Sequence, residues 1–491
     1  MYITMKKLFL IIPAVIAASA VMAQSEDDAL RFSQTYQQGT ARSAAMGGAF
    51  GALGGDLSVL STNPAGMSIY KDGEFSFTPC FGNITSNTNL NGFENEDSKF
   101  NFKIGNIGFV TSHHNGNESG FSGIAFGMTF NRLYDFSANT LVDGRNDFSS
   151  RLDFWTDRSR GLSPDEMDDY ADFRAYDCFL MDVTDSASWT YTNLHHQGNR
   201  AVYGQYQQLI QTIKGGINSW DFALSGVYAE KLYFGASLGI QTVNYKYNST
   251  FSEEDRNNVP GIGYDYYDFE EEQETRGTGI NLKAGVIYKP VNYLRFGAAI
   301  HTPTFYSLTD KYRTNMTSKL DFDDKVYESY PDMNNYDYRL YTPSKAILSA
   351  AFIVPNYGLI SVDYEYVDYK HSRFETNDDD NYSFKLENQA MKDKFKATKN
   401  IRVGIEGLAG QISLRAGYAM YGNPYKFVTD DIQRQIISGG VGFRGDDFYI
   451  DLTGTYHIYK TDRYLYEGNN PAMYSIENNH LYIMATFGVK F

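Results

Sequence analysis

The sequence predicts an all-β fold, a transmembrane barrel of fourteen antiparallel strands. Residues 480–491 end the chain with apolar side chains at every odd position, from Leu481 to Phe491. Side chains alternate between the two faces of a strand, so this segment has one face suited to hydrocarbon and one suited to water. Thirteen more segments of this kind, together with 40 Tyr, 34 Phe and 44 Gly, extend the same pattern along the chain.

The amino terminus predicts export from the cytoplasm. Lys6 and Lys7 precede an apolar run from Leu8 to Val21, and Ala23 supplies a small residue at the expected cleavage position. The run is shorter than the ~20 residues of a spanning helix. We therefore expect residues 1–23 to be a cleaved signal peptide and the mature protein to be integral to the outer membrane of a Gram-negative cell.

Composition excludes two other classes of protein. A net charge of -16 and a pI near 5.0 argue against a nucleic-acid-binding surface. A mean hydropathy of -0.42, with no second long apolar run, argues against a helical membrane protein. A soluble, secreted all-β protein remains the alternative.

The alternating segments fix a strand count and an orientation. They are residues 74–86, 101–113, 120–133, 220–229, 232–248, 276–289, 294–306, 343–354, 359–372, 400–407, 411–421, 434–444, 448–459 and 480–491. Short turns join consecutive segments at five of the connections, at 229–232, 290–293, 355–358, 408–410 and 445–447. Longer links lie between these turns. We expect these short turns to be periplasmic and the longer links to be extracellular.

One extracellular link, residues 135–219, is too long for a plain loop and is predicted to be a partly helical insertion. Ser163-Pro164-Asp165-Glu166 is a capping box with proline at the first helical position. A second helix is expected over 201–214, with an apolar stripe ended by Gly215 and Gly216. The stripe is Tyr203, Tyr206, Leu209, Ile210 and Ile213. It either packs on the protein itself or forms an outer groove for a hydrophobic ligand.

Residues 24–72 do not alternate like a strand and are rich in glycine. The lumen of a fourteen-stranded barrel is wider than its own side chains fill, because ~8 strands already make a barrel that is just filled. We therefore expect this segment to be a hatch inside the lumen, and residues 73–491 to form the barrel.

Several motifs in this chain resemble the FadL/TodX family of outer-membrane fatty-acid and hydrocarbon channels, in its Bacteroidota branch. The hatch carries Gly39-Thr40-Ala41-Arg42-Ser43-Ala44-Ala45-Met46-Gly47-Gly48-Ala49-Phe50 and then Asn63-Pro64-Ala65-Gly66. The stretches 294–303, 400–406 and 414–418 also resemble this family. The resemblance runs in order through the whole mature chain.

The resemblance implies a passive channel for hydrophobic small molecules such as long-chain fatty acids. Asn63, Pro64 and Ala65 would be the gate, and 135–219 would build the outer groove. A kink in 120–133, permitted by Gly120, Gly123 and Gly127, would provide a lateral exit. Implied partners are the hydrophobic substrate, membrane lipid and lipopolysaccharide, and the barrel-assembly machinery. Some Bacteroidota members serve protein secretion instead, so a surface-assembly protein that holds secreted cargo is the alternative function.

Basic residues on lumen-facing positions are candidates for binding a carboxylate. They are Arg402, Arg415 and Lys490. Because acidic residues alternate with them along the wall, a purely structural ion network is an equal alternative.

We expect no enzyme, metal or cofactor. The histidine pairs at 113–114 and 195–196 are poor metal sites, since adjacent side chains on a strand point apart. No serine nucleophile motif is evident. Cys80 and Cys178 are expected in different parts of the fold, which makes their pairing geometrically doubtful.

Overall fold

The computed structural model describes residues 25–36, 39–115, 119–197, 200–376, 383–428, 432–468 and 470–491. The predicted signal peptide lies outside these residues. No helix in the described ranges is long and apolar enough to cross a membrane.

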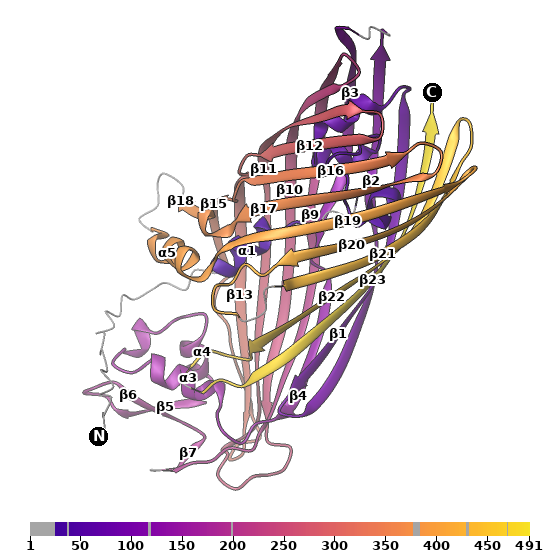
Figure 1. Ribbon diagram of the computed structural model, residues 1–491. Coiled ribbons are helices and arrows are strands. Elements are labelled where there is room, and N and C mark those ends of the chain that lie inside the picture. The colour runs from indigo at the N-terminus through magenta and orange to yellow at the C-terminus, as the bar shows by residue number, and fades with distance from the viewer. Residues whose placement is uncertain are drawn as a thin grey trace, which may run out of the picture.

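Fourteen antiparallel strands form the barrel, as predicted (Figure 1). Each pairs with the next, and the last pairs with the first from Glu74 and Lys490 to Leu90 and Tyr474, which closes the cylinder. The strands are β1 (Glu74–Leu90), β2 (Phe93–His114), β3 (Phe121–Asp135), β9 (Tyr206–Tyr228), β10 (Leu232–Glu254), β11 (Tyr264–Val291), β12 (Leu294–His301), β16 (Lys345–Val354), β17 (Gly358–Asp368), β19 (Ala397–Ala409), β20 (Ile412–Gly422), β21 (Ile432–Arg444), β22 (Phe448–Tyr464) and β23 (Met473–Lys490). The predicted short turns all lie at the end of the barrel where β1 begins and β23 finishes, which we call the inner end.

Side-chain exposure follows the alternation of the sequence. On β22, Phe448, Ile450 and Leu452 are exposed on the outside, whereas Asp451 and Thr453 are buried in the lumen. The outside is therefore apolar over the band that would contact lipid, and the inside is polar.

The outer rim of the barrel has unequal height. β12 continues outward as β13 (Phe305–Leu320), which pairs with β14 (Val326–Ser329), and β15 (Asn334–Tyr341) leads into β16. Pro303 and Pro343 occupy the two adjacent breaks, where they cannot donate a ladder hydrogen bond. β17 passes through a 3-10 turn, η4 (Tyr369–His371), into the short β18 (Arg373–Thr376), and helix α5 (Lys385–Lys394) lies between β18 and β19.

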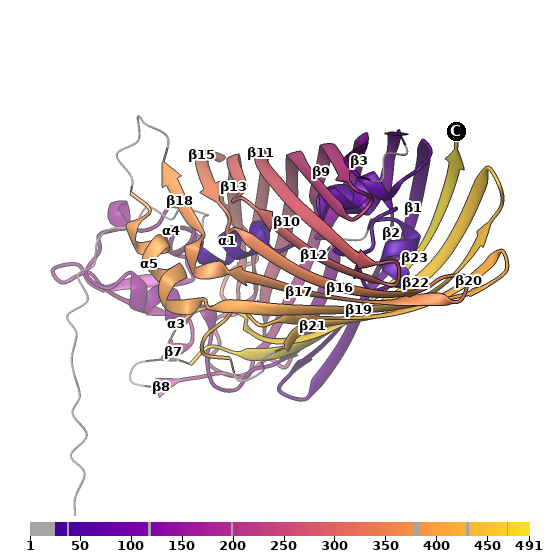
Figure 2. The same ribbon diagram turned by 45° about the horizontal axis from the view of Figure 1, so that its top comes forward.

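The hatch lies inside the barrel, as predicted (Figure 2). It consists of α1 (Glu26–Ser33), α2 (Ala41–Ala45), η1 (Leu57–Ser61) and η2 (Pro64–Ile69). Thr40, Asp56 and Asn63 begin the last three elements, and the side chain of each accepts a backbone hydrogen bond. Such capping residues let short helices form without a long helical run.

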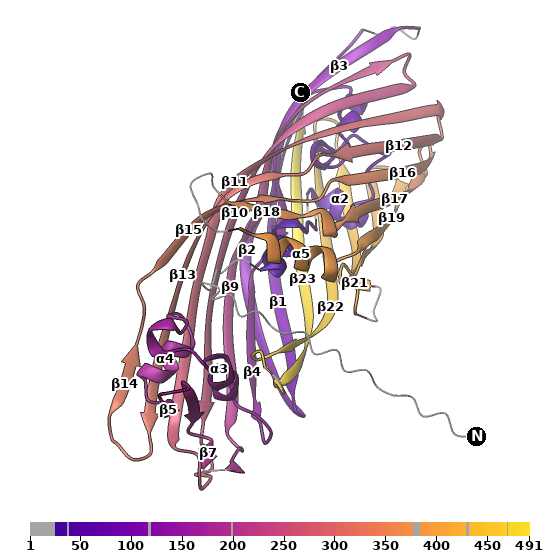
Figure 3. The ribbon, with the colours of Figure 1, turned by 90° about the vertical axis from the view of Figure 1, so that its left-hand side faces the viewer.

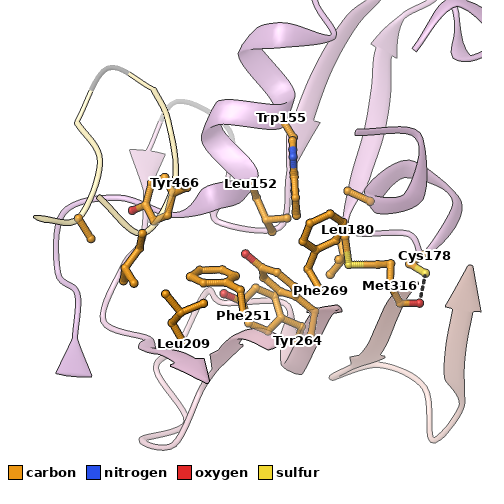
Figure 4. Close-up of a cluster of buried hydrophobic side chains, with 14 of the residues drawn as sticks. Leu152, Trp155, Cys178, Leu180, Leu209, Phe251, Tyr264, Phe269, Met316 and Tyr466 are labelled. Atoms are coloured by element: carbon orange, nitrogen blue, oxygen red, sulfur yellow. Dashed lines mark hydrogen bonds between the residues drawn. The ribbon is translucent and has the colours of Figure 1, made fainter. Parts of the chain in front are cut away.

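A compact cap covers the outer ends of β9, β10, β11 and β13 (Figure 3). It contains α3 (Arg151–Arg158), η3 (Pro164–Glu166), α4 (Asp172–Asp177), β5 (Met181–Asp185), β6 (Thr190–Asn193), β7 (His196–Gln197) and β8 (Arg200–Ala201). It follows β4 (Ala138–Arg145), which pairs with β9 in the wall. Leu152, Trp155 and Leu180 of the cap pack on Phe251 and Phe269 of the barrel (Figure 4). The predicted capping box at Ser163 begins η3, a single turn.

The helix expected over 201–214 is wrong. β9 begins at Tyr206 and pairs with β10 on one side and with β4 on the other through this segment. Gly215 and Gly216 lie within the strand and do not end a helix. The insertion is consequently shorter than 135–219, because β4 and the start of β9 belong to the wall.

The two cysteines are free thiols, and both are buried. Cys80 lies on β1, and Cys178 lies in the cap, where its thiol donates to the carbonyl oxygen of Met316 at 3.4 Å (Figure 4). Burial raises the pKa of the Cys178 thiol to about 12.

The lipid face can be tested by placing an arginine on β22. Leu452→Arg should impair folding, because an arginine facing lipid at the middle of the bilayer costs about 2 to 4 kcal/mol. Asp462→Arg, on the same face of the same strand but nearer the outer end, should fold normally. Heat-modifiable mobility on a gel measures the folded fraction, and equal yields for both variants would show that the apolar band is misplaced.

The cap core can be tested by thiol labelling in a Cys80→Ala background. Cys178 should resist a maleimide at pH 8 in the folded protein, because it is buried and its thiolate is scarce. A cysteine introduced by Ser186→Cys, at an exposed position of the cap, should label at once. Rapid labelling of Cys178 before denaturation would contradict a packed cap.

Candidate functional site

The predicted gate residues lie where the hatch meets the barrel wall. Asn63 is buried, and its side-chain oxygen accepts a hydrogen bond from the backbone N–H of Ala65 at 3.2 Å, which caps η2. Its side-chain amide donates to the carbonyl oxygen of Gly51 at 2.6 Å and to that of Val286, on β11, at 3.2 Å. Pro64 takes the first position of η2, where a missing N–H is tolerated.

Glycines of the wall allow this close approach. A Cβ atom on Gly285 would lie 2.0 Å from the side-chain oxygen of Asn63, and one on Gly235 would lie 2.7 Å from the backbone of Pro64. Gly127, one of the glycines assigned to the lateral exit, has this role as well, since its Cβ would lie 2.7 Å from the sulfur of Met67. The hatch therefore rests directly on the wall backbone.

An ion network fixes the hatch on the opposite wall. Arg42 of the hatch pairs with Glu406 at 2.9 Å. Arg415 pairs with Glu406 at 2.5 Å and with Asp451 at 2.6 Å. Arg415 is fully buried and its charge is already matched, so its role is structural and it does not present a free site for a carboxylate.

A small cavity lies between the hatch and the wall, and polar and apolar groups line different parts of it. Phe32 and Leu133 contribute apolar surface, and Lys283, Lys345 and Arg402 contribute positive charge. His301, Thr62, Gln241 and Glu365 are among its other lining residues. One cavity thus offers both a hydrocarbon surface and cations.

The cations of the cavity differ in how fully they are paired. Lys283 forms an ion pair with Asp221, and Lys345 donates to the hydroxyl oxygen of Thr35 at 2.6 Å. Arg402 donates from Nη1 to Glu365 at 3.1 Å, and its Nη2 forms an ion pair with Asp363 at 3.6 Å. Its buried Nε and Nη2 atoms make no hydrogen bond among the described residues. Buried donors without an acceptor are rare, and a bound anion would satisfy them.

Two of these cations, Lys283 and Lys345, were missed by sequence reasoning. Lys283 occupies an inward position of its predicted strand, so strict alternation could have identified it. Lys345 directly follows the break at Pro343, where the alternation gives no guidance. Lys490, a predicted candidate, lies at the inner end beside Asp447 and does not line the cavity.

The glycines assigned to a lateral exit lie on a wall that is closed in this structure. β3 pairs with β2 from Gly123 to Asn131, and a register shift between Phe121 and Gly123 marks a bulge against β9. Gly120 precedes the strand, and its carbonyl oxygen accepts from the N–H of Ala229 at 2.6 Å.

Beyond Asn131, β3 no longer pairs with β2, and side-chain contacts replace the backbone hydrogen bonds between the two strands. Lys103 pairs with Asp135 at 2.6 Å, Asn101 donates to the same carboxylate at 2.9 Å, and Lys99 donates to the carbonyl oxygen of Ile213 at 2.7 Å. A seam held by side chains therefore begins at the outer end of the segment predicted to kink, beyond the paired stretch that contains Gly123 and Gly127.

The residues predicted to form an outer groove do not share one surface. Leu209 is buried in the core of the cap, whereas Ile210 is 45% exposed on the other face of β9. Ile213 packs in the lumen, Tyr206 lies at the strand start, and the Tyr203 hydroxyl donates to Asp153 at 2.9 Å. The expected stripe is wrong because a strand, unlike a helix, sends neighbouring side chains to opposite faces.

No group of three or more His, Cys, Asp or Glu side chains in the described ranges is arranged to bind a metal ion. No protein-family model matches the sequence, and no curated protein matches it.

Solved structures do match. The chain is similar to the toluene transporter TodX of P. putida, with a TM-score of 0.54 and 14% identity over 93% of this chain and 99% of that one. A FadL homologue of Pseudomonas aeruginosa gives 0.55 and 14% over 92% and 99%. The Ralstonia pickettii toluene transporter TbuX gives 0.50 and 12% over 93% and 99%. The predicted resemblance to the FadL/TodX family is thereby confirmed at the level of the fold.

Proposed function

We propose that this protein is an outer-membrane channel for the passive uptake of hydrophobic small molecules, and that its preferred substrates are long-chain anionic amphiphiles such as fatty acids. The observation that carries the proposal is the cavity in which Phe32 and Leu133 face Lys283, Lys345 and Arg402. A carboxylate would be held by the cations, and its chain would lie on the apolar side.

The lumen beyond the cavity supplies the rest of the path. An aromatic cluster that includes Phe32, Tyr245, Tyr338 and Phe374 lies next to the cavity, toward the outer end. An apolar chain gains roughly 25 cal/mol per Å² when it leaves water, so it would favour this cluster over an open aqueous pore.

The structure represents a closed state. The cavity has a volume of about 50 Å³, whereas pockets for ligands of drug size occupy roughly 300 to 1,000 Å³. Entry of a fatty acid therefore requires part of the hatch, such as α1, to move. Among the contacts that would have to separate are individual hydrogen bonds such as that of Asn63 with Val286, each worth about 1 kcal/mol net.

The exit is proposed to lie beside β3, at the seam with β2 that begins beyond Asn131; Gly120, Gly123 and Gly127 lie on the paired, inner part of the same strand. Support comes from the replacement of backbone pairing by the contacts of Lys103 and Asn101 with Asp135. Side-chain contacts can separate without breaking the closed ladder of the inner half.

The charge in the cavity can be tested by Lys345→Met, which keeps the length of the side chain. Loss of one cation should lower the uptake of ionised oleate by about tenfold, the effect of 1.4 kcal/mol, and should leave toluene uptake unchanged. Lys311→Met, on the exposed outside of β13, is the matched control. The measurement is transport of labelled substrates by cells that carry each variant as their only such channel, and equal loss of both substrates would contradict a carboxylate site.

The hatch can be tested by Asn63→Ala. The variant loses the cap of η2 and the contact with Val286, and uptake of oleate should fall. The amount of folded barrel should not change, because Asn63 takes no part in the strand ladder. Absence of wild-type uptake across a panel of fatty acids and aromatic hydrocarbons, together with co-purification of a secreted protein, would instead support the surface-assembly function.

A further inference from the structure

One side of the outer wall is built without continuous strand pairing. β19 begins at Ala397, opposite the last residue of β17, Asp368. Beyond that point β18 leaves to pair with β15, and within the described ranges no strand pairs with its other edge. Helix α5 occupies the space on this low side of the rim, next to α1 of the hatch (Figures 1 and 3).

The side chain of Asn388 joins α5 to the free edge of β18 by hydrogen bonds, beside a ring contact at 5.2 Å between Phe384, at the start of the helix, and Phe374. The side-chain oxygen of Asn388 accepts from the backbone N–H of Phe374 at 2.8 Å, and its amide donates to the carbonyl oxygen of the same residue at 3.0 Å. These two bonds replace the backbone bonds that a neighbouring strand would make. This contact is a latch that can open without disrupting the barrel ladder.

The other end of α5 is held by the backbone. The N–H of Lys396 donates to Pro424 at 2.7 Å, and the N–H of Lys426 donates to Lys394 at 2.8 Å. Phe395 forms an isolated bridge with Tyr425. Since this end is firmly tied, α5 has the geometry of a lid with a hinge at residues 394–396 and a latch at Asn388.

The underside of the lid is apolar and continues to the cavity. Met391 and Phe395 are fully buried, and they belong to the same cluster as Phe32, which also lines the cavity. The helix also contacts α1 through the ion pair between Lys394 and Glu26. Lifting α5 would thus uncover an apolar route that ends at the cavity cations.

Lysines lie on the lid and on the segment that follows it, in a protein that is acidic as a whole. Residues 383–399 contain five lysines and two carboxylates, whereas the whole chain has a net charge of -16. Apolar side chains project from the same region, with Leu386 73% exposed and Phe427 84% exposed. Positive charge next to exposed hydrocarbon surface matches a single-chain anionic amphiphile.

We propose that α5 is the lid of a side entrance, through which an anionic amphiphile passes from the low rim to the cavity. This inference rests on the proposed uptake function for its substrate, but the movement of the lid can be measured independently of transport.

The first experiment measures opening of the lid. Met391→Cys places a thiol under α5, and its labelling by a membrane-impermeant maleimide is followed in the Cys80→Ala, Cys178→Ala background. Adding Asn388→Ala should raise the labelling rate about fivefold or more, because the latch is lost. Adding Gln389→Ala, on the exposed face of the same helix, should not. Equal rates with and without Asn388→Ala would overturn the latch.

The second experiment locks the lid. In the same background, Asn388→Cys and Glu375→Cys are joined by bifunctional methanethiosulfonates of increasing length, and the links are later cleaved with dithiothreitol. Uptake of oleate should fall severalfold when the lid is locked and recover after reduction. Unchanged uptake by the fully locked protein would overturn the entrance. If the unlocked protein takes up no amphiphile, the proposed function fails, and the labelling rates still decide whether α5 is a lid.

The third experiment tests the charge of the lid. Lys385→Gln combined with Lys392→Gln should lower oleate uptake and spare oleyl alcohol, which has the same chain and no charge. Equal loss of both would contradict selection of an anionic head group at this entrance.

Discussion

The requirement that every backbone polar group find a partner inside the bilayer governs this structure. Pairing of β1 with β23 meets it by closing the ladder. A closed ladder of fourteen strands encloses more space than inward side chains fill, so the chain must bring a separate segment into the lumen. The hatch, its glycine contacts and the small cavity are all consequences of that closure.

Two buried arginines of the lumen, Arg415 and Arg402, differ in how fully their hydrogen-bond donors are used. Arg415 lies between Glu406 and Asp451, and this pairing offsets the cost of removing the charges from water. Arg402 also lies between two carboxylates, Glu365 and Asp363, but its Nε and Nη2 atoms make no hydrogen bond among the described residues, and it lines the cavity. The two arginines therefore differ in the use of their hydrogen-bond donors and not in charge balance, and the unused donors of Arg402 are the reason for proposing it as a binding residue. Residue type and strand position alone do not make this distinction.

The sequence predicted the barrel well because a strand with one face in lipid has an alternating pattern that few other structures share. The same reasoning was wrong over 201–214, where apolar residues at helical spacing and two glycines also fit a strand that pairs with β10 and β4, with Leu209 buried under the cap and Ile210 exposed on the other face. The cavity was only partly predictable. Lys283 and Lys345 are 62 positions apart, and the register of β11, β12 and β16 brings them together.

Beside Asn63 and Pro64, the hatch fits against the wall because the wall has glycine there. This limits the exchange of a hatch or a wall between related barrels. Gly235 and Gly285 leave no room for a methyl group beside Asn63 and Pro64. A hatch transplanted into a related barrel would therefore fit only if the recipient wall had glycine at the matching heights on the matching strands. The hatch and the wall are complementary in shape, so a chimaera must carry the wall glycines together with the hatch.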